Sequence, residues 1–234
     1  MPNEVATRRV LYEIPGMQSI QPRDFEFAGA DGESLPGRIY LPEATDLAPG
    51  VVVIVEGYPD PGFVKHVGCR FMDMQWSISV AQLIAASGMA AITYANRQPA
   101  ADAAAIIDHV ITHAPRLGID ASRIALWATS GHGPVAIPLL DRASCAVLSN
   151  PVTEGAGMVS LSVPIFLIRS GNDETPGLNV SLDRFIATAL AQNQPMTVVN
   201  HHEAPHSFEL YHDSSTTRLI LRQGLTFLAE RLKA

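Results

Sequence analysis

Residues 123–133 read Arg-Ile-Ala-Leu-Trp-Ala-Thr-Ser-Gly-His-Gly, and this stretch carries the strongest indication of the fold. Its first six residues form a short, largely apolar run of the kind that is buried on both faces of a parallel sheet. Residues 133–142 are expected to form a helix. Ser130 therefore stands, beside Gly131, on the turn from a buried strand into a helix. That is the setting of a nucleophile elbow, which lifts a serine hydroxyl above the edge of the sheet.

The elbow pattern is imperfect at its two ends. The usual form is G-x-S-x-G, whereas this chain has Ala128 in the first position and His132 in the last. Alanine is small enough for close packing of strand and helix, but histidine is not, although Gly133 follows directly. The alternative is an ordinary strand-to-helix turn in which Ser130 caps the helix. The strand–serine–glycine–helix context favours the elbow.

The rest of the chain alternates between strands and helices after residue 50. An opening antiparallel hairpin is predicted over residues 23–28 and 37–41. The remaining predicted strands are 51–55, 89–95, 145–149, 164–169 and 196–200, and the remaining predicted helices are 78–87, 102–113, 182–192 and 216–233. This order predicts an α/β domain with a mainly parallel sheet covered on both sides. We expect one domain over 1–234, with residues 1–20 as an N-terminal extension.

The composition narrows the class of protein. The chain has 234 residues, of which 47% are hydrophobic, and a net charge of −7 from 16 basic and 23 acidic residues. No cluster of basic residues indicates a nucleic-acid partner. Cys69 and Cys145 make no disulfide framework. The longest aliphatic run, 51–55, is too short to span a bilayer, and no signal-like stretch follows the N-terminus. These features predict a cytoplasmic protein without a membrane partner, and they leave its oligomeric state open.

An activated serine needs a base, and the base needs an orienting carboxylate. On this kind of sheet, ligands bind beyond the carboxyl ends of the strands, and the expected chain order is serine, acid, histidine. Asp173 follows the predicted strand 164–169 and Gly171, with Glu174 as the competing carboxylate. His206 lies between the last predicted strand and the last helix. We therefore predict that Ser130, Asp173 and His206 converge at one edge of the sheet.

The oxyanion hole is expected between the elbow and the loop after the first buried strand, which begins Glu56-Gly57-Tyr58. Our candidates for its donors are the backbone N–H groups of Tyr58 and Gly131. Gly57 allows the main chain to approach closely. Glu56 and His132 are candidates for supporting residues. Glu56 either reaches the elbow or faces water, and the sequence leaves both interpretations open.

Three stretches carry a resemblance to a known family. Residues 126–133 (LWATSGHG), 165–185 (IFLIRSGNDETPGLNVSLDRF) and 198–208 (VVNHHEAPHSF) resemble the dienelactone-hydrolase branch of the α/β-hydrolases. The resemblance implies an eight-stranded, mostly parallel sheet with helices on both faces. It also implies hydrolysis of a carboxylic ester or lactone of a small molecule, without a metal or organic cofactor.

The same resemblance suggests roles for individual residues. Ser130 matches the nucleophile, Asp173 the acid and His206 the base, and Glu56 is similar in place to the glutamate beside the nucleophile. Two departures bear on the substrate: dienelactone hydrolases proper use cysteine as the nucleophile, and their elbow ends in glycine where this chain has His132.

The connections between strands bear on the shape of the site. Only residues 150–163 lie between the two strands that flank the usual position of a lid, so no large cap domain is expected. Residues 58–77 either form a pocket wall or pack the core. A serine esterase or lactonase is the leading hypothesis. Two alternatives are a small-molecule-binding or signalling protein with a misplaced Ser130, which His132 at the elbow motivates, and an acyltransferase.

Overall fold

A central eight-stranded sheet organises the chain in the computed structural model, which describes residues 3–43, 47–155 and 162–233. The strand order is β1-β2-β4-β3-β5-β6-β7-β8. The strands are β1 (Arg23–Ala28), β2 (Ser34–Tyr40), β3 (Val51–Ile54), β4 (Ala90–Tyr94), β5 (Ile124–Thr129), β6 (Cys145–Ser149), β7 (Ile165–Ser170) and β8 (Met196–His201). The pairs β1–β2 and β2–β4 are antiparallel and the others are parallel.

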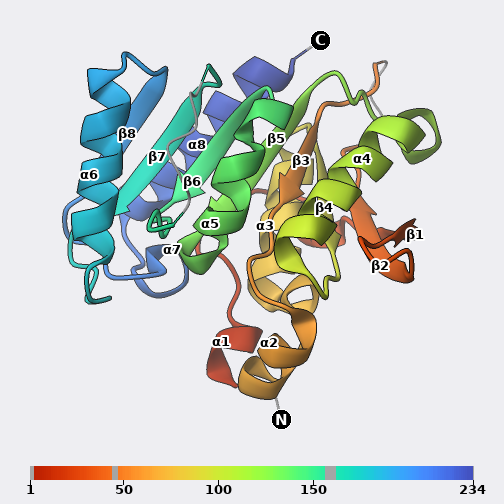
Figure 1. Cartoon of the computed structure of the whole chain (residues 1–234), viewed down its shortest axis with the longest axis horizontal. Coiled ribbons are helices and arrows are strands. Elements are labelled where there is room, and N and C mark those ends of the chain that lie inside the picture. Colours follow the sequence, from red (N-terminus) through yellow and green to blue (C-terminus); the bar gives the residue numbers. More distant parts are fainter. Residues whose placement is uncertain (1–2, 44–46, 156–161, 234) are drawn as a thin grey trace.

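Helices cover both faces of this sheet (Figure 1). The α-helices are α1 (Glu4–Thr7), α2 (Asp60–Val67), α3 (Gln75–Ala86), α4 (Pro99–Leu117), α5 (Gly133–Ala136), α6 (Leu178–Ala191), α7 (Phe208–Tyr211) and α8 (Ser215–Leu232). Helices α4, α5 and α6 pack on one face, and α3, α7 and α8 contribute to the core on the other. The mostly parallel, doubly covered sheet predicted from the alternation of elements is confirmed.

The β-branched run of β3 shows why the sheet is buried on both sides. Successive strand residues point to opposite faces. Val51 and Val53 therefore join the core beneath α4 to α6, while Val52 and Ile54 join the core beneath α3 and α8. All four are at most 1% exposed. An alternating polar pattern would not suit such a strand, which is why the continuous apolar run was informative.

Two segments differ from the helices expected from the sequence. The predicted helix 133–142 is α-helical only over α5 and continues as a 3₁₀ helix, Ile137–Arg142. Pro138 has no N–H to donate to the carbonyl of Pro134, so the α-helical pattern cannot continue through it. Residues 58–77, which were expected only as a connection, contain α2, the 3₁₀ helix Phe71–Asp73 and the start of α3.

The remaining segments frame the carboxyl edge of the sheet. Residues 3–20 pack along α3, where the Val10 N–H donates to Ser79 Oγ at 2.9 Å. Between β6 and β7 the chain has 15 residues, 150–164, which is too short for a cap domain. Residues 156–161 of this connection, on which part of that expectation falls, lie outside the described residues. No helix in the described part of the chain has the length and apolar character needed to cross a membrane.

Candidate active site

Three polar side chains meet at the carboxyl edge of the sheet. Ser130 follows β5, Asp173 follows β7, and His206 lies in the loop between β8 and α7. The Ser130 Oγ stands 2.8 Å from His206 Nε2, and His206 Nδ1 stands 2.5 Å from Asp173 Oδ2. The structure thus brings together the three residues that the chain order pointed to, in one continuous hydrogen-bonded row.

Ser130 is held in a strained conformation. Its φ of 49° lies in the left-handed region, which side chains with a Cβ rarely adopt. The turn is fixed from outside, because the Val152 N–H donates to the Ser130 carbonyl at 2.8 Å. Such a turn between a strand and a helix raises the hydroxyl out of the sheet edge and leaves helix-terminal N–H groups behind it.

Asp173 is arranged to stay ionised. Its side chain is fully buried, which alone would raise its pKa, but hydrogen bonds from His206 and from the Thr175 N–H hold the pKa below its usual value. The Thr175 N–H contacts Oδ1 at 2.8 Å. An ionised Asp173 accepts a hydrogen bond from the N–H at His206 Nδ1, which leaves Nε2 with its lone pair toward Ser130. This is the protonation state that a general base requires.

Asn150 is a member of the site that sequence reasoning missed. Its side-chain Nδ2 donates to Asp173 Oδ2, and its Oδ1 accepts from the Ser170 N–H at 2.8 Å. Its φ is 46°, so the residue stands on a left-handed turn directly after β6. A polar residue after a buried strand was the available signal, since the same reasoning selected Ser130 and Asp173.

The competing residues lie elsewhere. Glu174 is exposed, as is His202, whose side chain is 77% accessible. His201 is buried, and its Nε2 lies 3.1 Å from Thr217 Oγ1. None of the three joins the hydrogen-bonded row of Ser130, His206 and Asp173.

His132 fits the elbow because its ring turns toward the loop after β3. There its Nδ1 accepts the Gly57 N–H at 2.6 Å. Burial lowers the pKa of His132 to about 3, so the ring is neutral and free to accept at Nδ1. The ring also packs against Phe71, with ring centroids 4.3 Å apart, and against Tyr58 at 5.4 Å. His132 therefore connects the elbow to the loop that carries Tyr58.

The close approaches expected of an elbow glycine are made by the neighbouring glycines. A Cβ on Gly133 would stand 2.3 Å from the Val152 carbonyl oxygen, and a Cβ on Gly57 would stand 2.6 Å from the Gly131 carbonyl oxygen. Both distances are too short for any side chain. Gly57 thus permits the close approach of the main chain that we expected of it. Gly133 permits the close backbone contact that the usual pattern assigns to the glycine at the position of His132.

The two expected oxyanion donors belong to the loop after β3 and to the turn after β5. The Tyr58 backbone N–H makes no hydrogen bond with any described residue. Gly131 lies in the first turn of the 3₁₀ helix Ser130–His132, where N–H groups lack partners within the helix. The Gly57 N–H, by contrast, is already bonded to His132 and is not available to a substrate.

Glu56 is fully buried at the end of β3, so the interpretation that it faces water is wrong. Burial, with the nearby Asp60 carboxylate adding to it, raises the pKa of Glu56 to about 10. Its carboxyl group is therefore protonated at neutral pH. Asp60 is itself buried and accepts the Asn96 N–H at 3.1 Å.

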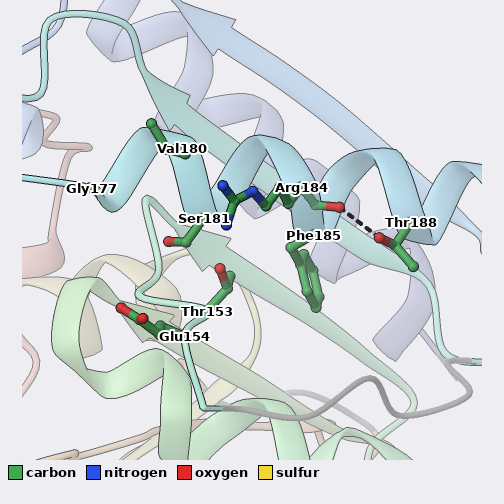
Figure 2. A pocket seen from close by; sticks show the side chains of 8 residues that line it. All are labelled: Thr153, Glu154, Gly177, Val180, Ser181, Arg184, Phe185 and Thr188. Carbon is green, nitrogen blue, oxygen red and sulfur yellow. Dashed lines mark hydrogen bonds between the residues drawn. The ribbon is translucent and has the colours of Figure 1, made fainter.

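Two hollows flank this edge of the sheet. One, of about 460 Å³, lies between α6 and the segment after β6, and Figure 2 shows Ser181, Arg184 and Phe185 on one side of it and Thr153 and Glu154 on the other. The second, of about 300 Å³, is formed by α2 and the preceding loop. Its lining residues are Tyr58, Pro59, Gly62, Phe63, His66 and Val67. Within the described residues, no group of side chains is arranged to hold a metal ion.

The overall arrangement of strands and helices is shared with solved structures. A bacterial heroin esterase superposes with a TM-score of 0.75 at 16% identity, over 96% of this chain and 88% of that one. The chain has the α/β-hydrolase fold. An esterase of Pyrobaculum calidifontis (TM-score 0.75, 15% identity, 93% and 88% covered) and a thermostable carboxylesterase cloned from a metagenomic library (0.71, 16%, 96% and 92%) are similar to it as well. The sequence itself matches no protein-family model and no curated protein.

Proposed function

We propose that this protein is a serine hydrolase that cleaves a carboxylic ester or lactone of a small molecule. One observation carries the proposal: an unbroken row of hydrogen bonds, 2.8 Å and 2.5 Å long, runs from Ser130 through His206 to the buried Asp173. Ser130 stands at the head of this row on a left-handed turn, with a φ of 49°. Nucleophile, base and orienting carboxylate are then in the geometry that acyl transfer requires.

The reaction follows from this geometry. Ser130 Oγ attacks the carbonyl carbon while His206 Nε2 takes the hydroxyl proton, and the carbonyl oxygen becomes an oxyanion. The oxyanion collapses, the bond to the alkoxy oxygen breaks, and His206 returns the proton to the departing alcohol. Water then attacks the acyl-enzyme and gives its proton to His206. The bond between the acyl carbon and Ser130 Oγ breaks, His206 returns the proton to Oγ, and the acid leaves. Asp173 stabilises the imidazolium in both halves.

The negative charge on the carbonyl oxygen needs donors already in place. The backbone N–H groups of Tyr58 and Gly131 serve this purpose in the proposal. They are held by the contact of Gly57 with Gly131 and by the hydrogen bond from the Gly57 N–H to His132. Rigid donors stabilise the transition state without reorganisation during the reaction, which is the largest single contribution to many enzymatic rates.

Several observations support esters over other acyl compounds. The solved structures similar to this chain include esterases and a carboxylesterase. The His206 side chain is 32% exposed, so the site is open to small molecules in solution. A dienelactone-hydrolase-like lactone or ester substrate is the finer proposal, which rests on the sequence resemblance.

Cys69 and Cys145 are free thiols, which supports a cytoplasmic location.

The binding-protein alternative rested on a misplaced Ser130. The distance of 2.8 Å between Ser130 Oγ and His206 Nε2 removes that reason. Acyl transfer to an alcohol uses the same residues and differs only in the acceptor. Product analysis in the presence of an added alcohol separates transfer from hydrolysis.

A comparison of wild type with Ser130→Ala on a panel of p-nitrophenyl esters and small lactones tests the proposal. We expect the variant to lose about 10⁴-fold or more in turnover. Ser87→Ala, at the opposite edge of the sheet before β4, is the matched control and should behave as wild type. A fluorophosphonate probe should label wild type and Ser87→Ala stoichiometrically and leave Ser130→Ala unlabelled. Wild-type turnover in Ser130→Ala would refute the proposal.

A further inference from the structure

The hollow formed by α2 and the preceding loop, called the α2 hollow below, lies next to the elbow. The ring of Tyr58 forms part of its wall, and a Cβ built on Gly131 would lie only 1.7 Å from the Tyr58 hydroxyl oxygen. His66 and Val67, in the last turn of α2, line the hollow as well. The α2 hollow therefore borders the turn that carries Ser130.

The lining of the α2 hollow is apolar. Its accessible surface contains no polar atoms, and none of its lining residues is a lysine, arginine, aspartate or glutamate. The hollow beside α6, in contrast, has Glu154 and Arg184 in its lining. An apolar group gains free energy by leaving water, whereas a charged group without a partner loses it. The α2 hollow therefore suits an uncharged, apolar group.

The walls of the α2 hollow are held in place by contacts within the protein. The Tyr58 carbonyl accepts a hydrogen bond from Asn96 Nδ2 at 3.0 Å, and the Tyr58 ring stacks on Phe63, with ring centroids 6.2 Å apart. At the other end of α2, the Asn3 N–H donates to the Val67 carbonyl at 3.0 Å. A hollow that is formed in advance binds a group without the entropic cost of ordering its walls.

The strand order indicates which part of an ester reaches this hollow. Strand β3, which leads to the hollow, neighbours β5 on one side, whereas β6, β7 and β8 follow on the other side and lead to His206. In the proposed reaction His206 returns its proton to the departing alcohol, so the alkoxy oxygen lies on the His206 side of Ser130. The acyl chain leaves the carbonyl carbon in the other direction, toward the end of β3.

We propose that the α2 hollow binds the acyl group of the ester and that this group is apolar and uncharged. This inference rests on the proposed ester hydrolysis and adds its substrate class, which is esters of small apolar carboxylic acids. The carbonyl carbon stands at Ser130 Oγ, the acyl chain passes along the Tyr58 ring into the hollow, and the alcohol stays outside it.

Gly62 offers a variant that fills the α2 hollow without disturbing the fold. It lines the hollow in the first turn of α2, and a Cβ built on it meets no atom within 4 Å. A methylene that leaves water completely raises a rate or binding constant by about fourfold. In wild type, kcat/KM for p-nitrophenyl esters should therefore rise by about twofold to fourfold per methylene from acetate to hexanoate.

In Gly62→Leu this rise should disappear, because the leucine side chain occupies the space of the acyl chain. Its kcat/KM for the acetate should stay within about threefold of wild type, and Gly62→Ala should fall between the two. Thr226→Leu is the matched control, since it adds the same side chain at an exposed position in the second half of α8. It should match wild type with every ester.

The charge and the orientation of the substrate are tested with two further sets of esters. In wild type, the p-nitrophenyl monoester of glutaric acid should react at least about tenfold more slowly than the pentanoate, because its carboxylate finds no partner in the hollow. With ethyl, butyl and hexyl acetate, Gly62→Leu should behave as wild type, since the alcohol lies outside the hollow.

Alkylboronic acids test the occupancy of the α2 hollow without a leaving group. Ser130 Oγ bonds to boron and gives its proton to His206, and the alkyl group then stands where the acyl chain stands in the tetrahedral intermediate. Pentylboronic acid should inhibit wild type at least about tenfold more tightly than methylboronic acid. In Gly62→Leu the two inhibition constants should differ by less than about threefold.

The outcomes separate this inference from the proposed hydrolysis. If Gly62→Leu keeps the wild-type rise from acetate to hexanoate and the wild-type preference for pentylboronic acid, the hollow does not bind the acyl group, and the hydrolase proposal stands. If Gly62→Leu changes only the series of alkyl acetates, the alcohol binds there and the inference is wrong. If wild type turns over no ester, both proposals fall together.

Discussion

Replacing Glu56 by glutamine should stabilise the protein, and the gain should grow with pH. Glu56 is fully buried, and burial raises the pKa of its carboxyl group from 4.5 to about 10. Between these two values the folded protein keeps the proton while the unfolded chain has lost it. Because the pKa of Glu56 is raised in the folded state, the stability linked to this carboxyl group is fully present below pH 4.5. It is lost as the pH rises toward 10.

The magnitude follows from the size of this window. Each pH unit between the two pKa values corresponds to about 1.4 kcal/mol. A pH of 7.5 lies three units above the unfolded pKa of 4.5. The stability that wild type loses through Glu56 at this pH is therefore at most about 4 kcal/mol. Glutamine keeps the shape of the protonated acid but cannot ionise in the unfolded chain. Structural relaxation reduces the limit, and we expect Glu56→Gln to gain about 2–4 kcal/mol at pH 7.5.

Urea unfolding of wild type and Glu56→Gln at pH 5, 6.5 and 8 measures this difference directly. The gain should be small at pH 5 and should rise by about 1 kcal/mol per unit above it. Glu33→Gln, an exposed position in the turn between β1 and β2, is the control and should show no such trend. A stability difference between Glu56→Gln and wild type that does not vary with pH would refute a protonated Glu56.

Two further substitutions examine the site. Asp173→Asn should keep the fold but lower kcat by about 10⁴-fold, because an amide holds the wrong tautomer of His206; near-normal kcat on p-nitrophenyl acetate would remove Asp173 from the mechanism. His132→Phe should destabilise the protein by about 1–3 kcal/mol, since the Gly57 N–H loses its acceptor. Because the folded pKa of His132 is lowered to about 3, the wild type loses stability as pH falls below 6.5. In urea unfolding, the deficit of His132→Phe should shrink between pH 6.5 and 5, and a constant deficit would contradict a neutral buried imidazole.

The sequence predicted the sheet well because burial on both faces leaves a direct trace in the chain. The run Val51–Ile54 could be identified as a strand without knowledge of its neighbours. Helix α2 was missed because Pro59, Pro61 and Gly62 look like loop residues. Pro61 lies in the first turn of α2, where its missing N–H costs no hydrogen bond, so it was compatible with a helix start. A proline thus shows reliably that an α-helix does not continue through its position. It does not show that no helix begins there.

The sequence predicted only those site residues that can be recognised by their own chemistry and by their position after a strand. Ser130, Asp173 and His206 each follow a separate strand, and the parallel topology alone places such positions at one edge. Asn150 occupies an equivalent place, yet an amide is neither a nucleophile nor a base nor the orienting carboxylate, so sequence reasoning passed over it. Its function depends on a contact with Asp173, 23 residues away in the chain, that only the folded structure shows.

His132 shows that the elbow pattern reflects which backbones must approach closely, and that the glycine that allows this can stand at a neighbouring position. The usual glycine at this position lets two backbones approach, and here Gly133 makes that approach, with a Cβ position 2.3 Å from the Val152 carbonyl. A histidine was then free to turn its ring toward a loop 75 residues earlier and accept the Gly57 N–H. Because the Gly57 N–H is bonded to His132, it is not one of the proposed oxyanion donors, which are the N–H groups of Tyr58 and Gly131. The departure from the pattern at His132 is therefore compatible with the proposed elbow.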